Sequence, residues 1–165
     1  MKYIGSIAAV AVALAGICAF GAAQQKPAVS GEAAMFTQAD VERAFEQIPT
    51  KPPTNKNIVE QEHYQVAVAR VAGRNGPVEL HQASDRVFFV KAGKAVMRVG
   101  GKLAGAREIS PGEFRSAGAS VDGEGYSDYR ELVMEAGAIL SVPRDVPYQL
   151  VAEKGDVSFV VVRIK

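Results

Sequence analysis

The sequence is poor in the residues on which much protein chemistry depends. Its 165 residues include one cysteine, two histidines and no tryptophan. The cysteine, Cys18, lies in an apolar N-terminal segment that we expect to be removed, which excludes disulfides, thiolate metal sites and cysteine nucleophiles from the mature chain. Removal of Lys2 with this segment would lower the 19 basic residues to the number of acidic ones, 18. Such a neutral balance excludes an electrostatic argument for nucleic acid or anionic lipid as the main partner.

The first 23 residues have the pattern of a secretory signal peptide. Lys2 supplies a positive start, residues 7–15 are uniformly apolar, and Gly21-Ala22-Ala23 provides the small residues of a cleavage site. We therefore expect cleavage after residue 23, a periplasmic or secreted location, and no membrane contact afterwards. The alternative is an uncleaved membrane anchor, because the apolar run reaches the lower limit of a spanning length.

Residues 24–60 are expected to form a tether and one short amphipathic helix ahead of the main domain. Thr37 can cap a helix with Asp40 three residues later. Apolar residues then recur with helical spacing at Val41, Ala44, Phe45 and Ile48. Three prolines end this pattern, and Lys51 to Asn57 is predicted to be a linker.

The remaining sequence predicts strands only. Alternating or short apolar runs, each bounded by Gly, Pro, Asn or Asp, lie at residues 64–68, 87–90, 95–99, 131–134, 138–142, 147–151 and 157–164. Many short strands with closely spaced turns favour an all-β sandwich or closed barrel over an α/β fold. The hydrophobic content of 48% is sufficient for a single core in a chain of this length.

A long segment, Lys102 to Asp128, separates two groups of predicted strands. It is rich in glycine, serine and acidic residues, and loops of this length in a compact domain are commonly lids or binding loops. Phe114, Tyr126 and Tyr129 could cover the opening of a barrel. The alternative is an insertion that takes no part in the chemistry.

Two motifs with regular glycine and proline spacing lie within the strand-rich region. The first comprises Gly73, Glu79, His81, Arg86 and Gly93, and the second comprises Gly137, Pro143, Asp145, Tyr148 and Ala152. This pair of motifs resembles the two motifs of the cupin superfamily. The resemblance implies a cupin-like jelly-roll β-barrel over residues 61–165. It also implies a metal ion held by two histidines and a glutamate from the first motif and a histidine from the second.

In this sequence the four metal-binding positions of the resemblance hold Glu79, His81, Arg86 and Tyr148. Arginine has no available lone pair, and its positive charge would repel a divalent cation. Glu79 and His81 alone fall short of the three or four protein ligands that usually hold zinc or iron. We therefore expect no metal cofactor, and Glu79 and His81 would be the ligands if a divalent metal were bound.

Strand alternation decides which side chains enter the barrel. In the predicted strand, Arg86, Phe88 and Val90 share one face, which we expect to be the interior. A register shifted by one residue would turn Asp85 inward and create a Glu79, His81 and Asp85 triad. Both faces of the strand are apolar, so alternation alone does not exclude that register.

Two interpretations of the polar cluster remain open at this stage. Glu79 and Arg86 could neutralise one another while Tyr148 fills the remaining volume. Alternatively, Arg86, His81 and Tyr148 could receive a ligand that carries a carboxylate or hydroxyl group, because arginine offers paired donors to a planar anion.

The function predicted first is an exported, metal-independent module that binds a small polar or carboxylate-bearing molecule. Its site would comprise Glu79, His81, Arg86, Phe88 and Tyr148. The alternative is a metal-dependent cupin enzyme, an oxygenase or isomerase, that uses Glu79, His81 and either Asp85 or Tyr148. A third interpretation is a structural domain that forms homodimers through an exposed strand edge at Val157 to Val162. His63, the other histidine, is expected to be solvated.

Overall fold

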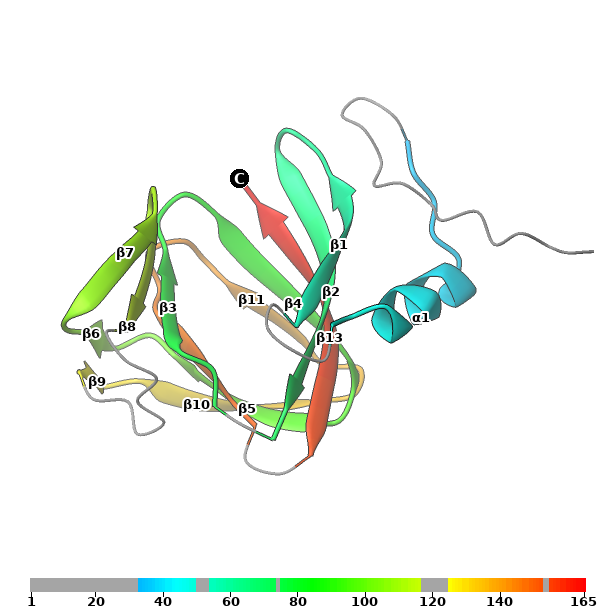
Figure 1. Cartoon of the computed structure of the whole chain (residues 1–165). Helices are drawn as coiled ribbons and strands as arrows, with labels where there is room; N and C mark the ends of the chain where they lie inside the picture. Colours follow the sequence, from blue (N-terminus) through cyan, green and yellow to red (C-terminus); the bar gives the residue numbers. More distant parts are fainter. Residues whose placement is uncertain (1–32, 50–53, 74, 117–124, 153–154) are drawn as a thin grey trace, which may run out of the picture.

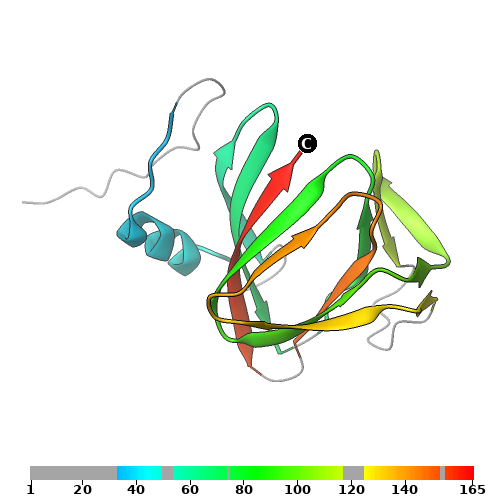
Figure 2. The same cartoon turned by 180° about the vertical axis from the view of Figure 1, so that it is seen from behind.

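Two antiparallel β-sheets face one another and enclose the core (Figures 1 and 2). The computed structural model describes residues 33–49, 54–73, 75–116, 125–152 and 155–165, so the predicted signal peptide and most of the tether lie outside the described residues. The strand content and antiparallel pairing confirm the predicted all-β jelly roll with a short helix in front. No helix in these ranges is long and apolar enough to span a membrane.

The first sheet has the strand order β1-β2-β13-β4-β11 and the second has the order β10-β5-β12-β3-β8-β7. The first sheet contains β1 (Asn55–Glu60), β2 (Tyr64–Ala72), β4 (Asp85–Ala92), β11 (Ile139–Val142) and β13 (Asp156–Ile164). The second contains β3 (Val78–His81), β5 (Lys94–Val99), β7 (Ala106–Ser110), β8 (Glu113–Ser116), β10 (Arg130–Glu135) and β12 (Tyr148–Val151). A small separate pair is formed by β6 (Lys102–Leu103) and β9 (Tyr126–Ser127).

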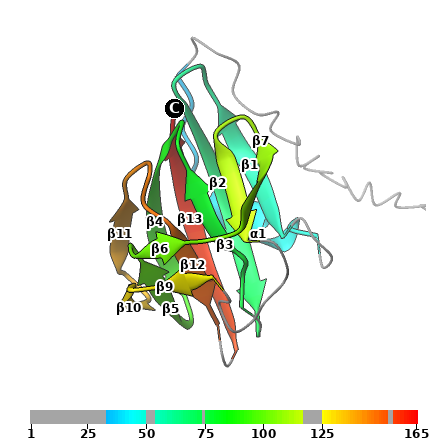
Figure 3. The same cartoon turned by 90° about the vertical axis from the view of Figure 1, so that its left-hand side faces the viewer.

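The helix α1 (Gln38–Glu46) lies on the outer face of the first sheet, to the right of β2 and β13 in Figure 1 and largely behind the strands in Figure 3. Thr37 caps it as predicted, because the Thr37 hydroxyl accepts from the Asp40 amide while the Asp40 carboxylate accepts from the Thr37 amide. Its apolar face packs in a cluster of buried residues from the helix, β1 and β2, which comprises Ala44, Phe45, Ile48, Ile58, Val59 and Val68. The helix therefore covers the sheet from outside and takes no part in the space between the sheets.

The sequence did not indicate β1. Residues Asn55 to Asn57 were assigned to the linker, but they belong to this strand, which pairs with β2 along its length. The prediction is wrong there because the polar sequence of Asn55, Lys56 and Asn57 has no strand pattern. The strand is formed by pairing at the sheet edge and by the two buried residues that follow, Ile58 and Val59.

The long segment Lys102 to Asp128 is also more regular than predicted. Four strands, β6 to β9, lie within it, and β8 pairs with β3 while β7 pairs with β8. The expectation of a loop is therefore wrong for Lys102–Leu103, Ala106–Ser110, Glu113–Ser116 and Tyr126–Ser127. Tyr126 is buried and donates its hydroxyl to the Pro147 carbonyl at 3.1 Å. Residues 117–124 lie outside the described residues.

The strand β13 is central in its sheet. It pairs with β2 on one side and with β4 on the other, so Val157 to Val162 offers no free backbone edge. The prediction of an exposed edge at this run is wrong, because the apolar run reflects burial in the middle of the sheet. Homodimerisation itself stays a prediction.

The motif glycines occupy positions that other residues would strain. Gly93, between β4 and β5, has a φ of +83°, and a Cβ built there would lie 2.0 Å from the Asp156 carbonyl oxygen. Gly137 has a φ of +88° before β11. Glycine adopts such conformations without steric cost, and at Gly93 it also allows the turn to approach the start of β13 closely. The spacing of the motifs thus reflects the backbone of the fold.

Candidate functional site

A row of three polar side chains crosses the second sheet on its inner face. Tyr148 of β12 and Arg115 of β8 each lie directly opposite Glu79 of β3. The Tyr148 hydroxyl donates to Glu79 Oε2 at 2.9 Å, and Arg115 Nε donates to Glu79 Oε1 at 3.0 Å. Both oxygens of the Glu79 carboxylate are therefore held from opposite sides. The structure brings Glu79 and Tyr148 together as the motif spacing indicated.

A second row lies two residues further along the same strands. His81 of β3 is directly opposite Glu113 of β8, and both side chains are largely buried. Because residues two apart on a strand share a face, this row and the first point into the same space. The Nδ1 atom of His81 lies 3.7 Å from Glu113 Oε1. His81 was predicted for the site, whereas Glu113 lies in the long segment, Lys102 to Asp128, that was expected to be a loop.

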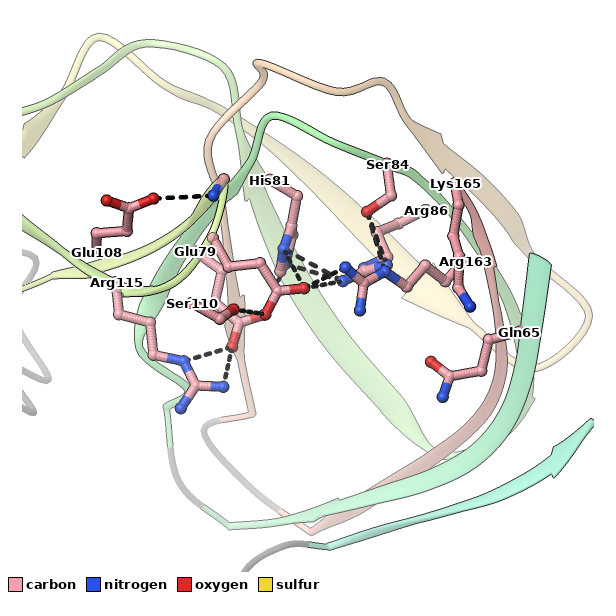
Figure 4. A network of polar contacts seen from close by, with 12 residues as sticks. Gln65, Glu79, His81, Ser84, Arg86, Glu108, Ser110, Arg115, Arg163 and Lys165 are labelled. Carbon is pink, nitrogen blue, oxygen red and sulfur yellow. Dashed lines mark hydrogen bonds and ion pairs between the residues drawn. The ribbon is translucent and has the colours of Figure 1, made fainter. Parts of the chain in front are cut away.

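Two arginines face these rows from the opposite sheet (Figure 4). Arg86 of β4 lies directly opposite Arg163 of β13. The Arg86 Nη1 and Arg163 Nε atoms both donate to the Ser84 hydroxyl at 3.2 Å, and Ser84 is only 1% exposed. A single buried hydroxyl thus accepts from two guanidinium groups. Like charges directly opposite one another on neighbouring strands are unfavourable unless an anion lies between them.

The Glu113 carboxylate lies where the two arginines meet. Its Oε1 atom is 2.5 Å from Arg163 Nη2 and 3.6 Å from Arg86 Nη2. Its Oε2 atom accepts from the Ser110 hydroxyl at 2.8 Å. Burial alone would raise the pKa of Glu113, but the Ser110 hydrogen bond and the nearby cations lower that pKa below its ordinary value. Glu113 is therefore a carboxylate anion at neutral pH.

His81 connects the two rows with the arginines. The Tyr148 hydroxyl is 3.0 Å from His81 Nε2, and because it donates its one proton to Glu79 it can only accept from His81. This assignment places the imidazole proton on Nε2 and leaves Nδ1 as the acceptor for Arg86 Nη2 at 3.2 Å. Neither ring nitrogen is left with a free lone pair.

The protonation states of Glu79 and Tyr148 agree with this network. Burial raises the pKa of the Tyr148 hydroxyl well above its usual value, and the Glu79 charge raises it further, while Arg86 opposes the increase. Burial would also raise the pKa of Glu79. The hydrogen bond from His81, the charge of Arg115 and the Tyr148 hydroxyl outweigh burial and lower the Glu79 pKa. Tyr148 is thus a neutral donor and Glu79 an anionic acceptor.

Phe88 forms the apolar boundary of the polar cluster. It is 5% exposed, and its ring lies edge-on to Tyr148 and to Phe159, with centroids 5.7 and 5.5 Å away. Arg86, Phe88 and Val90 therefore share the inner face, while Phe89 is 40% exposed. Among the predicted site residues, Phe88 alone offers no polar group. It would contact the apolar part of any molecule held there.

Two alternatives that the sequence left open do not occur. Glu79 could have neutralised Arg86, but Glu79 pairs with Arg115, and Arg86 faces Glu113. Asp85 was considered as a third metal ligand, but its carboxylate lies outside the barrel and accepts from the Arg144 backbone amide and guanidinium at 2.8 and 3.2 Å. The Arg144 hydrogen bonds lower the Asp85 pKa. The triad register does not occur.

The donor set does not fit the metal ion that the cupin resemblance implies. Both nitrogens of His81 are engaged, and the Arg86 guanidinium lies against the ring where a cation would have to bind. Within the described ranges, no group of three or more His, Cys, Asp or Glu side chains is arranged to hold a metal ion. His63, the other histidine, is exposed beside Glu62. The expectation that the protein binds no metal cofactor stays a prediction.

Sequence reasoning missed four residues that complete the cluster: Ser84, Glu113, Arg115 and Arg163. For Arg163 a signal was available, because Phe159, Val161 and Arg163 alternate in an apolar run and so share one face. Glu113 and Arg115 share a face in the same way. Their position beside β3 depends on a pairing between distant strands, which the local sequence does not indicate.

Comparison with solved structures shows the same fold. A match to protein BH2720 of Bacillus halodurans has a TM-score of 0.55 at 10% identity and covers 81% of this chain and 83% of that one. A match to protein NMB1881 of Neisseria meningitidis has a TM-score of 0.52 at 13% identity and covers 76% and 97%. A cupin-2 domain containing protein from Shewanella frigidimarina matches at a TM-score of 0.49 and 16% identity, covering 76% and 92%.

At these identities the likeness concerns the fold alone. No family model matches the chain, and no curated protein matches it in sequence. The strand order, together with the likenesses at TM-scores of 0.55 and 0.52, confirms the predicted all-β jelly roll.

Proposed function

We propose that this protein is an exported module that binds a small polar molecule without a metal ion, in the space between the two sheets. The site comprises Glu79, His81, Arg86, Phe88 and Tyr148 from the two motifs, with Ser84, Glu113, Arg115 and Arg163 around them. Its donors and acceptors are held by one another, as is typical of a preorganised binding site. Export is proposed on the pattern of residues 1–23.

The position of the Arg86 guanidinium carries this proposal. Its side chain is largely buried and lies within 3.4 Å of both nitrogens of His81, the residue best suited to bind a metal. A fixed positive charge at this point opposes a divalent cation and favours an anionic or hydroxyl-bearing ligand. A metal-dependent oxygenase or isomerase would need Arg86 to leave the site and His81 to exchange its hydrogen bonds.

A thermal-shift screen of the purified mature chain tests the proposal. We expect one or more small carboxylates, hydroxy acids or sugars to raise the melting temperature, because a ligand at 100 times its Kd stabilises the native state by about 2.7 kcal/mol. The increase should be lost in Arg86→Gln and kept in Arg144→Gln. Arg144 is a matched control because its guanidinium pairs with Asp85 outside the barrel.

Elemental analysis after refolding with iron, manganese or zinc distinguishes this proposal from the alternative of a metal-dependent enzyme. The proposal expects much less than one metal ion per chain. One tightly bound ion per chain, lost on His81→Gln, would instead establish a metal-dependent site. A screen in which no small molecule stabilises the native chain would also overturn the binding function.

A further inference from the structure

The arginine pair is already occupied by a carboxylate that belongs to the protein. Arg86 and Arg163 lie opposite one another with both side chains directed inward, and the Glu113 carboxylate lies between them and the second sheet. The remaining anion of the cluster, Glu79, is held by Arg115 and Tyr148. Glu113 thus supplies one negative charge against two guanidinium groups, and the arginine pair retains an excess of positive charge.

Glu113 is poorly bonded for a buried carboxylate. Its Oε1 atom has no hydrogen bond of acceptable geometry among the described residues, although Arg163 Nη2 approaches it to 2.5 Å. The other oxygen accepts from the Ser110 hydroxyl. A buried acceptor without a well-formed hydrogen bond is unfavourable, so this oxygen is held by the charges of the arginines alone, and a ligand carboxylate that forms better hydrogen bonds can compete for them.

The carboxylate can leave the arginine pair without disruption of the sheet. Glu113 is the first residue of β8, and the turn before it is fixed independently, because the Gly112 carbonyl accepts from the Gln82 amide at 2.7 Å. The side chain retains 17% exposure. Rotation about its side-chain torsions would move the carboxylate outward while the β3–β8 pairing stays intact.

We infer that Glu113 is a displaceable occupant of a carboxylate-binding subsite formed by Arg86, Arg163 and Ser84, and that the ligand is a small carboxylic acid that replaces it. This inference rests on the proposed binding function and names the ligand class. A neutral ligand could not replace Glu113, because two opposed guanidinium groups would then lack an anion. A ligand carboxylate restores that anion and presents the same planar pair of oxygens to the arginines.

Acetate, the probe for the experiment, is titrated while the ring signals of His81 are followed by NMR. The chain has two histidines, so His63→Gln identifies the His81 signals. In Glu113→Gln, which removes the competing charge and keeps the shape, we expect acetate to bind about tenfold more tightly than in the wild type. That gain corresponds to an arginine pair that Glu113 occupies about nine-tenths of the time. In Arg163→Gln the saturable shift should disappear.

The matched control is Glu135→Gln, which removes one carboxylate from the exposed pair with Lys94 and should leave acetate affinity unchanged. Equal affinity in the wild type and Glu113→Gln would overturn the inference, as would the absence of a saturable shift in both. Circular dichroism and thermal unfolding of each variant establish that it is folded. If an uncharged ligand raises the melting temperature in the thermal-shift screen while acetate does not bind, this inference is overturned. The proposed binding function would still stand in that case.

Discussion

The two ends of the space between the sheets are built from the same strands and differ completely in chemistry. On β4, Arg86 is followed two residues later by Phe88, and on β13, Arg163 is preceded by Val161 and Phe159 on the same face. One end holds two guanidinium groups, and the other holds a closely packed apolar core. A step of two residues along a strand, about 7 Å, separates them.

This contrast indicates that the two ends of each strand contribute differently, one to stability and the other to binding. Apolar burial at one end supplies stability, because it is favourable without regard to direction. The polar end contains buried charges, whose removal from water costs free energy that their pairing only partly recovers. We therefore expect substitutions at the apolar end to change mainly stability, and substitutions at the polar end to change mainly what the site binds.

The largest effect is expected at the apolar end, with Phe159→Ala. Phe159 is 5% exposed and packs against Phe88, so its loss leaves a cavity and should lower the free energy of unfolding by about 3–5 kcal/mol. Urea denaturation followed by circular dichroism measures this change in the free energy of unfolding. Val133→Ala, at a residue that is 58% exposed, is the control and should change the value by less than about 0.5 kcal/mol. Similar values for the two variants would contradict the contrast between the ends.

A smaller loss of stability, accompanied by a change in chemistry, is expected for Arg86→Glu at the polar end. The new carboxylate would join Glu79, His81 and Glu113 and supply the donors that a divalent cation lacks in the wild type. We expect the metal-free variant to lose about 1–3 kcal/mol of stability and to recover it with zinc or manganese, as shown by calorimetry and elemental analysis. Arg144→Glu, outside the barrel, should gain no metal. If the Arg86→Glu variant binds no metal and also keeps its stability, the Arg86 side chain does not enter the barrel.

The smallest effect is expected in the pH dependence of stability for Glu79→Gln. Folding lowers the Glu79 pKa below its ordinary value of 4.5, so its contribution is fully present above that pH and is lost as the pH falls through the folded-state pKa. Glu79→Gln should therefore flatten the acid side of the curve of unfolding free energy against pH. Denaturation between about pH 2 and 6 measures the slope. Glu135→Gln should have a weaker effect that salt removes, because its pair with Lys94 is exposed.

The features that local sequence determines could be predicted. Strand alternation placed Arg86, Phe88 and Val90 on one inner face, and the capping residues Thr37 and Asp40 marked the start of the helix. The motif spacing brought Glu79, His81 and Tyr148 together because it reflects fixed turns. Their use as a ligand site stays a prediction.

The pairing of charges could not be predicted, because it depends on which distant strands become neighbours. Glu113 belongs to a stretch that is typical of a turn, Ser110-Pro111-Gly112-Glu113, and β8 joins β3 only in the folded sheet. Arg163 reaches Arg86 because β13 lies between β2 and β4. Three cations and two carboxylates allow several pairings, and register alone decides among them.

The central place of β13 also has a consequence for biosynthesis. Ala72 pairs with Asp156 and Tyr64 pairs with Ile164. The sheet therefore cannot form around β2 until β13, which is translated much later, is available to pair with it. During that interval the inner faces of β2 and β4 are open to water and to other nascent chains, and contacts of such long range form slowly. We expect the unfolded polypeptide to depend on chaperones until β13 has paired with β2 and β4.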